Sequence, residues 1–128
     1  MRIKEGINKV VPVEMSTIYK ICNVAMWRDA ERAGKFCGSP VDIKDGFIHF
    51  STAEQAVETA AKHFAGQSDL VLVSVDAAKL GDQLKWEPSR GGALFPHLYG
   101  ELDAAAVTKV EPLPLGTDGN HEFPPFGL

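Results

Sequence analysis

The segment 17–34 contains one strand-like and one helix-like pattern. Alternation and β-forming residue types over Thr17–Cys22 predict a strand. Apolar residues then recur at helical spacing, with Asn23 as a suitable N-cap and Gly34 as a suitable helix stop. Trp27 lies on the apolar stripe of this helix, so we expect it in the core.

The segment 35–45 is predicted to be a loop. It is rich in glycine, proline and turn residues, with a short extended piece at 41–43 as the only regular feature. Because a loop held by a rigid scaffold often carries function, this segment is a candidate lid over a site.

A second helix is predicted over Thr52–Ala65, directly after a short strand at 47–50. Ser51 stands three residues before Glu54, which is the spacing of a capping box, so Ser51 is the predicted N-cap. Gly66 is the expected stop.

Strands dominate the rest of the chain. The run 70–75 is apolar throughout and is predicted to be a central strand buried on both faces. Shorter strands are predicted at 84–87, 94–99 and 105–110. Strands that follow the helices, instead of alternating with them, favour an α+β domain over a repeating βαβ sheet.

The length of 128 residues predicts a single domain, 1–128, with one core at about 17–112. An N-terminal arm, 1–16, precedes that core. A proline- and glycine-rich tail, 113–128, follows it, and we expect Phe123 and Phe126 to hold the tail against the body.

Composition narrows the class of partner. A formal net charge of −4 argues against a nucleic acid partner. No apolar run approaches the roughly 20 residues that span a membrane, and the first residues lack the apolar centre of a secretory signal. Two cysteines outside any metal-binding spacing fit a reducing compartment, so a cytoplasmic location is expected. A small-molecule ligand remains open, as does the oligomeric state.

Three groups of polar residues are candidates for chemistry. His49, Ser51 and Thr52 gather at a predicted helix start, where free N–H groups favour an anionic or electron-rich ligand. His49 alternates with two apolar neighbours, so it faces either solvent or a cleft. Arg90 lies in a glycine-rich loop and suits a phosphate or carboxylate. Simple capping and a solvated surface charge are the structural alternatives for these residues.

The third group is His97, Tyr99 and Glu101. If this piece is extended, His97 and Tyr99 lie on the same face, and either His49 or His97 can act as a general acid or base near neutral pH. The two histidines lack a third ligand at a metal-binding spacing, so no metal site is predicted. A hydrolase centred on Ser51 is disfavoured because the chain has no Gly-x-Ser-x-Gly elbow there.

Four segments resemble, in order, those of an uncharacterised bacterial family, domain-of-unknown-function family nine-five-two. They are Ile18-Tyr19-Lys20-Ile21, Gly46-Phe47-Ile48-His49-Phe50-Ser51-Thr52, Asp69-Leu70-Val71-Leu72-Val73 and Phe95-Pro96-His97-Leu98-Tyr99-Gly100. The resemblance covers roughly Thr17 to Pro112. It implies the ADP-ribosyltransferase-like fold group: an α+β domain with a split, mostly antiparallel sheet and two main helices around a cleft.

In that fold group NAD binds in the cleft, which implies roles for particular residues. Lys20 occupies the first-strand place of an Arg or His, although it lacks the planar fork of Arg. Ser51-Thr52 is similar to the start of a Ser-Thr-Ser segment, and Glu101 is the nearby residue for a late Glu, two residues beyond Tyr99 and outside the expected frame.

Two hypotheses of function follow from the resemblance. In the first, the cleft binds NAD or a related nucleotide, lined by Lys20, His49, Ser51, Thr52, Arg90, His97 and Tyr99. If it is an enzyme, the reaction is NAD-dependent ADP-ribosyl transfer or a related phosphoribosyl-type reaction. His49 and Tyr99 then position the nicotinamide ribose, and Glu101 or His97 supplies charge or a proton. In the second, the chain is a non-catalytic ligand-binding or regulatory module, which the displaced Glu101 favours.

Overall fold

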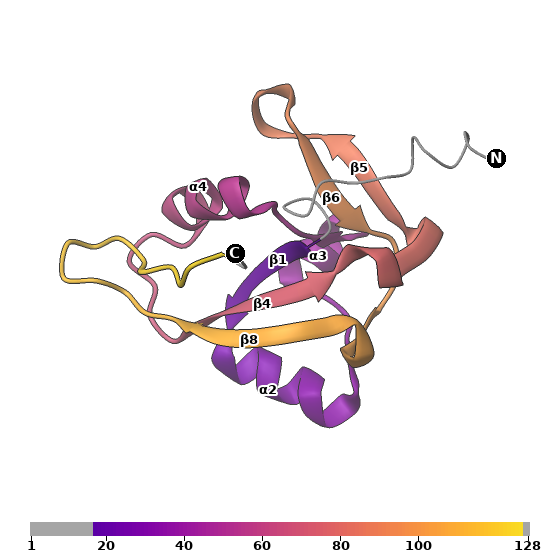
Figure 1. Cartoon of the computed structure of the whole chain (residues 1–128), viewed down its shortest axis with the longest axis horizontal. Helices are drawn as coiled ribbons and strands as arrows, with labels where there is room; N and C mark the ends of the chain where they lie inside the picture. Colours follow the sequence, from indigo (N-terminus) through magenta and orange to yellow (C-terminus); the bar gives the residue numbers. More distant parts are fainter. Residues whose placement is uncertain (1–16, 127–128) are drawn as a thin grey trace.

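The computed structural model describes residues 17–126, which form an α+β fold whose strand pairs are all antiparallel (Figure 1). The predicted class, α+β with mostly antiparallel pairing, is confirmed. The predicted N-terminal arm, 1–16, lies outside the described residues.

The strands form three sheets. The first has the order β1-β4-β8, the second β3-β6-β5, and the third β2-β7. The bounds are β1 Thr17–Asn23, β2 Lys35–Phe36, β3 Ile48–His49, β4 Leu70–Asp76, β5 Leu84–Pro88, β6 Leu94–Leu98, β7 Leu102–Asp103 and β8 Val107–Leu113. The α-helices are α2 Val24–Ala33, α3 Pro40–Asp45 and α4 Ala53–His63; the 3-10 helices are η2 Ala77–Gln83, η3 Arg90–Gly92 and η4 Ala104–Ala106.

Strand β4 is central and buried on both faces, as its apolar sequence predicts. On one face, Val71 and Val73 join a core cluster that includes Trp27 of α2, which is 3% exposed. On the other face, Leu70 and Leu72 pack in a second cluster with the alanines of α4. Helices α2 and α4 therefore cover opposite faces of the first sheet (Figure 1).

The chain after β4 follows the predicted order with shifted boundaries. The strand predicted at 105–110 is a 3-10 turn, η4, followed by β8 at Val107–Leu113, because the carboxylate of Asp103 accepts a hydrogen bond from the N–H of Ala105 and starts a turn there. In the tail, Phe123 and Phe126 pack against the second core cluster, as expected, and Phe126 contacts the ring of Tyr19 edge-on.

The first and second sheets join at one point. Ser51 pairs with Tyr19 through two backbone hydrogen bonds of 2.8 and 2.9 Å, on the edge of β1 that faces away from β4. Beyond this bridge the two sheets separate, so the rest of that edge of β1 is left without a neighbouring strand among the described residues.

The prediction of a loop at 35–45 is wrong. Pro40–Asp45 is helix α3, with Ser39 as the N-cap. Proline is favoured in the first turn of a helix, and the Asp42 carboxylate accepts a 2.8 Å hydrogen bond from the backbone N–H of Ser39. These local signals outweigh the turn residues that flank the segment.

The N-cap of α4 is Thr52, one residue after the predicted Ser51. Thr52 Oγ1 accepts from the backbone N–H of Gln55, and the Gln55 side chain accepts from the backbone N–H of Thr52, so Gln55 completes the capping box in place of Glu54. Ser51 is tied to the bridge with Tyr19 and cannot adopt this role. The helix ends at His63, with Phe64 as the C-cap, earlier than the predicted Ala65 and Gly66.

Replacing Thr52 with alanine is therefore expected to destabilise the fold by about 1 kcal/mol, the usual effect of removing an N-cap side chain. Replacing Glu54 with alanine is the matched control, and it should change the free energy of unfolding by less than about half of that amount, since surface substitutions rarely do more. Urea denaturation of the two variants measures both. Equal losses would contradict this assignment of the cap.

Candidate functional site

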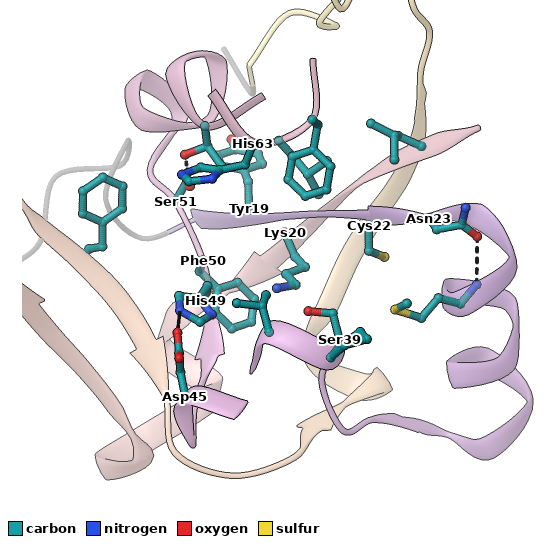
Figure 2. A pocket seen from close by; sticks show the side chains of 18 of the residues that line it. Tyr19, Lys20, Cys22, Asn23, Ser39, Asp45, His49, Phe50, Ser51 and His63 are labelled. Atoms are coloured by element: carbon teal, nitrogen blue, oxygen red, sulfur yellow. Dashed lines mark hydrogen bonds and ion pairs between the residues drawn. The ribbon is translucent and has the colours of Figure 1, made fainter. Parts of the chain in front are cut away.

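A pocket of about 660 Å³ opens where the first and second sheets separate. Its walls come from β1, the ends of α3, the segment 49–51, the last turns of α4 and strand β6. Among the predicted site residues, Lys20, His49, Ser51 and His97 line it. Figure 2 shows Lys20 extending from β1 toward α3, while Tyr19 points to the other side, toward α4.

The open edge of β1 forms part of the pocket wall. In an antiparallel strand the N–H and C=O of one residue point to the same edge, and successive residues alternate. Tyr19 directs both groups to Ser51, so Ile21 directs both of its groups to the same edge, beyond the bridge. No hydrogen bond to these groups of Ile21 occurs within residues 17–126.

Ile21 is only 5% exposed and lines the pocket. A buried backbone donor and acceptor need partners, because leaving them unpaired costs about as much as a lost hydrogen bond. The edge at Ile21 therefore offers one donor and one acceptor, side by side, to a pocket ligand.

Asp42 lies in α3, whose ends form the opposite wall of the pocket. Its side chain is 1% exposed, and its carboxylate accepts from Lys20 Nζ at 2.8 and 3.0 Å, from the backbone N–H of Ser39 at 2.8 Å and from His49. Burial alone would raise the pKa of Asp42, but the hydrogen bonds from His49 and Lys20 and the charge of Lys20 outweigh it and hold that pKa well below its usual range. Burial lowers the pKa of Lys20, and the Asp42 carboxylate opposes that shift.

His49 lies between two carboxylates. Its backbone N–H donates to Asp42 Oδ1 at 3.1 Å and its ring Nδ1 contacts the same oxygen at 2.6 Å. Its Nε2 lies 3.0 Å from Asp45 Oδ2, a contact marked in Figure 2. In the imidazolium form both ring N–H groups donate to a carboxylate, whereas a neutral ring can donate to only one. The expectation that His49 faces solvent or a cleft is resolved in favour of the cleft.

His97 is paired with Glu87 of the neighbouring strand. Its Nδ1 lies 2.7 Å from Glu87 Oε1, and Tyr99 donates its hydroxyl to the same oxygen at 2.8 Å. These two hydrogen bonds lower the pKa of Glu87. The hydrogen bond between Tyr99 and Glu87 also raises the pKa of Tyr99. His97 and Tyr99 therefore share a face, as alternation predicts.

Phe47 fixes the relative positions of these rings. It stacks on His97 with ring centroids 4.1 Å apart and an angle of 26° between the planes. Its centroid is 4.7 Å from that of His49 and 5.3 Å from that of Tyr99. The two imidazoles, which face each other across β3 and β6, have centroids 5.6 Å apart.

The remaining predicted site residues lie apart from this cluster. Thr52 caps α4, and Ser51 Oγ lies 3.1 Å from Thr59 Oγ1. Glu101 is exposed and does not line the pocket; its carboxylate lies 3.2 Å from Lys35 Nζ. The backbone of Arg90 lies in η3, and its side chain is outside the described part of the structure.

Four residues of the site were not predicted from the sequence: Asp42, Asp45, Glu87 and Phe47. The capping pattern Ser39-Pro40-x-Asp42 was a signal for Asp42, because it places a carboxylate at a helix start. No local signal identified Glu87, because its contact with His97 depends on the pairing of β5 with β6.

The described residues bear on a thiol nucleophile, on a metal site and on a membrane crossing. Burial, the largest effect, raises the pKa of the Cys22 thiol to about 11, so this pocket residue is a poor nucleophile at neutral pH. No group of three or more His, Cys, Asp or Glu side chains suited to a metal ion occurs in residues 17–126. In the same range, no helix has both the length and the apolar character that a membrane crossing requires.

Comparison with known proteins gives a family and a solved relative. A family model described as "Protein of unknown function (DUF952)" matches residues 21–110. The crystal structure of protein CC0527 from Caulobacter crescentus is 55% identical, with a TM-score of 0.80, over 83% of this chain and 93% of that chain. The solution NMR structure of CC0527 gives 56% identity and a TM-score of 0.75, over 83% and 91% of the two chains. No curated protein matches the chain.

Proposed function

The chain belongs to the family of unknown function DUF952, and we propose that the pocket beside β1 is a binding cleft for NAD or a closely related nucleotide. The observation that carries the proposal is the open edge of β1 at Ile21, which presents a buried N–H and C=O to the pocket. The resemblance to the ADP-ribosyltransferase-like fold group is part of the same proposal.

The size of the pocket suits such a ligand. Binding pockets for small molecules and cofactors usually measure about 300–1,000 Å³ and place a few polar groups on a mostly apolar lining. The volume here is about 660 Å³, and the lining combines Phe50, Phe64, Phe95 and Leu70 with the polar groups described above.

The nicotinamide carboxamide is complementary to the edge of β1. A primary amide carries an N–H donor and a C=O acceptor side by side, in the same relation as the two backbone groups of Ile21. A carboxamide there would satisfy both. At the other wall, Asp45 supplies a partly exposed carboxylate, which favours the positively charged nicotinamide ring of NAD.

Two versions of this function remain, and one residue distinguishes them. Glu101, the residue that the resemblance implies for the late carboxylate, lies outside the pocket and pairs with Lys35. This position supports the alternative proposal, a non-catalytic module that binds the nucleotide without turnover. The enzyme version needs another carboxylate near the histidines, and Glu87 is in contact with His97.

Calorimetric titration with NAD and with its nicotinic acid analogue tests the proposal. NAD is expected to bind saturably in the micromolar to low-millimolar range. The analogue should bind at least about tenfold more weakly, because a carboxylate has no donor and sets an acceptor against the C=O of Ile21. Equal affinities would contradict recognition by the strand edge, and a flat trace for both compounds would rule out NAD. Release of free nicotinamide, measured on the same samples, then separates the enzyme from the binding module.

A further inference from the structure

We propose that Glu87 is a positioning residue that holds His97 in its Nδ1–H tautomer, so that His97 Nε2 accepts a proton from a water molecule or hydroxyl group in the pocket. Neither the family description nor the resemblance assigns a role to Glu87. The choice of NAD as the ligand rests on the proposed function. The tautomer of His97, which Glu87 sets, does not depend on that choice.

The pairing of the strands creates this contact. His97 on β6 lies directly opposite Lys85 of β5, and Glu87 is two residues further along β5 on the same face. An ionised carboxylate can only accept a hydrogen bond, so the 2.7 Å contact between Glu87 Oε1 and His97 Nδ1 places a hydrogen on Nδ1. The second donor, Tyr99, stabilises the carboxylate in its ionised form.

The other ring nitrogen of His97, Nε2, can accept a proton. A neutral imidazole with its hydrogen on Nδ1 carries a lone pair on Nε2. Among the groups that the structure describes, which exclude the side chain of Arg90, no hydrogen bond to His97 Nε2 is present. His97 is 4% exposed and lines the pocket, so a ligand or a pocket water, and not bulk solvent, is its available partner.

The ring is also held in a fixed plane. Phe47 stacks on it, and His49 approaches edge-on with its own nitrogens directed at Asp42 and Asp45. Lys85 lies directly opposite His97 across the strand pair, and Lys20 and Asp45 line the same pocket. Among the described groups, His49 thus contacts two carboxylates, whereas His97 contacts one carboxylate through Nδ1 and has no hydrogen bond at Nε2.

With NAD in the pocket, the step would be hydrolysis of the bond between the nicotinamide and the ribose. A water oxygen forms a bond to ribose C1′ as His97 Nε2 takes one of the water protons. The bond from C1′ to the nicotinamide nitrogen breaks, and its electron pair stays on that nitrogen. The products are ADP-ribose and neutral nicotinamide, and the imidazolium then releases the proton to solvent.

The structural part is tested by ¹⁵N NMR of the histidine ring nitrogens in the ligand-free protein. We expect the Nδ1–H tautomer for His97 in the unmodified protein and in Lys85→Ala, a control that alters the directly opposite residue. In Glu87→Ala the ring should shift toward the Nε2–H tautomer. Glu87→Gln, whose side-chain oxygen still accepts a hydrogen bond, should restore Nδ1–H. An Nε2–H ring in the unmodified protein, or an unchanged ring in Glu87→Ala, overturns the proposal.

The chemical part is tested by the rate of nicotinamide release from NAD. Glu87→Ala is expected to lower kcat by at least about tenfold, a modest share of what a positioned acid or base contributes, with KM little changed. Absence of any nicotinamide release from the unmodified protein overturns the hydrolytic step. That outcome is distinct from failure of the proposed function, because binding of NAD is measured separately by calorimetry.

Discussion

Replacing Asp42 with alanine is expected to lower the free energy of unfolding by about 3–5 kcal/mol, the usual effect of removing one partner of a buried ion pair. The Asp42 side chain is 1% exposed and is bonded to Lys20, Ser39 and His49 at once. Its loss leaves the Lys20 ammonium buried without a counter-charge and removes the tie between α3 and β1. Chemical denaturation monitored by circular dichroism measures the change.

The matched control for this prediction is Asp45→Ala. Asp45 contacts the same histidine, but its side chain is 40% exposed. Exposed ion pairs contribute at most about 1 kcal/mol, so this variant should unfold close to the unmodified protein. Comparable losses in the two variants would show that burial of the Lys20–Asp42 pair does not determine stability here.

The same carboxylate gives the stability a pH dependence. The folded-state pKa of Asp42 is lower than in the unfolded chain, so the unfolded chain binds the proton more readily. The contribution of Asp42 to the free energy of unfolding is therefore complete above its pKa in the unfolded chain, about 3.9 for an aspartate. This contribution is lost as the pH falls through the pKa of Asp42 in the folded protein. This acid-induced loss should be reduced in Asp42→Ala relative to the unmodified protein.

The second large effect is expected on binding. Replacing His49 with alanine should weaken NAD binding by at least tenfold, equivalent to about 1.4 kcal/mol. His49 lines the pocket and orients Asp45, and its ring lies 4.7 Å from that of Phe47. Calorimetric titration of the variant measures the loss.

Glu101→Gln is the control for that prediction. Glu101 is charged and near the histidines in sequence, but its contacts are with Lys35 and Cys37, outside the pocket. It should leave the affinity for NAD unchanged. A loss of affinity in Glu101→Gln, with none in His49→Ala, would place the ligand elsewhere on the protein.

Local signals in the sequence were sufficient for most of the fold. Helical periodicity predicts α2 and α4, the residue types of 17–22 predict β1, and an uninterrupted apolar run predicts β4, which is buried on both faces. The same reasoning put His97 and Tyr99 on one face, where the structure has both bonded to Glu87. Helix α3 was missed because it has only six residues and too few turns to show a period.

The contacts within the site were beyond the sequence alone. Lys20 and Asp42 are 22 residues apart, and Glu87 and His97 are 10 residues apart across a strand pair. The first contact depends on how helix α3 packs against β1, and the second depends on the register of β5 with β6. Both follow from tertiary packing, not from local preference. For this reason the sequence predicts Glu101, which lies near His97 along the chain, whereas the carboxylate of Glu87 on the neighbouring strand contacts His97.

The most direct test of the binding cleft is an NMR titration of the ¹⁵N-labelled protein with NAD, in which the backbone amide of Ile21 is followed. We expect the resonance of this amide to shift strongly, and its proton to exchange more slowly with solvent, as NAD saturates the protein. The resonances of His49 and His97 should shift as well. An Ile21 amide that does not respond while NAD binds, or responses confined to residues outside the pocket, would contradict a ligand held by the open edge of β1.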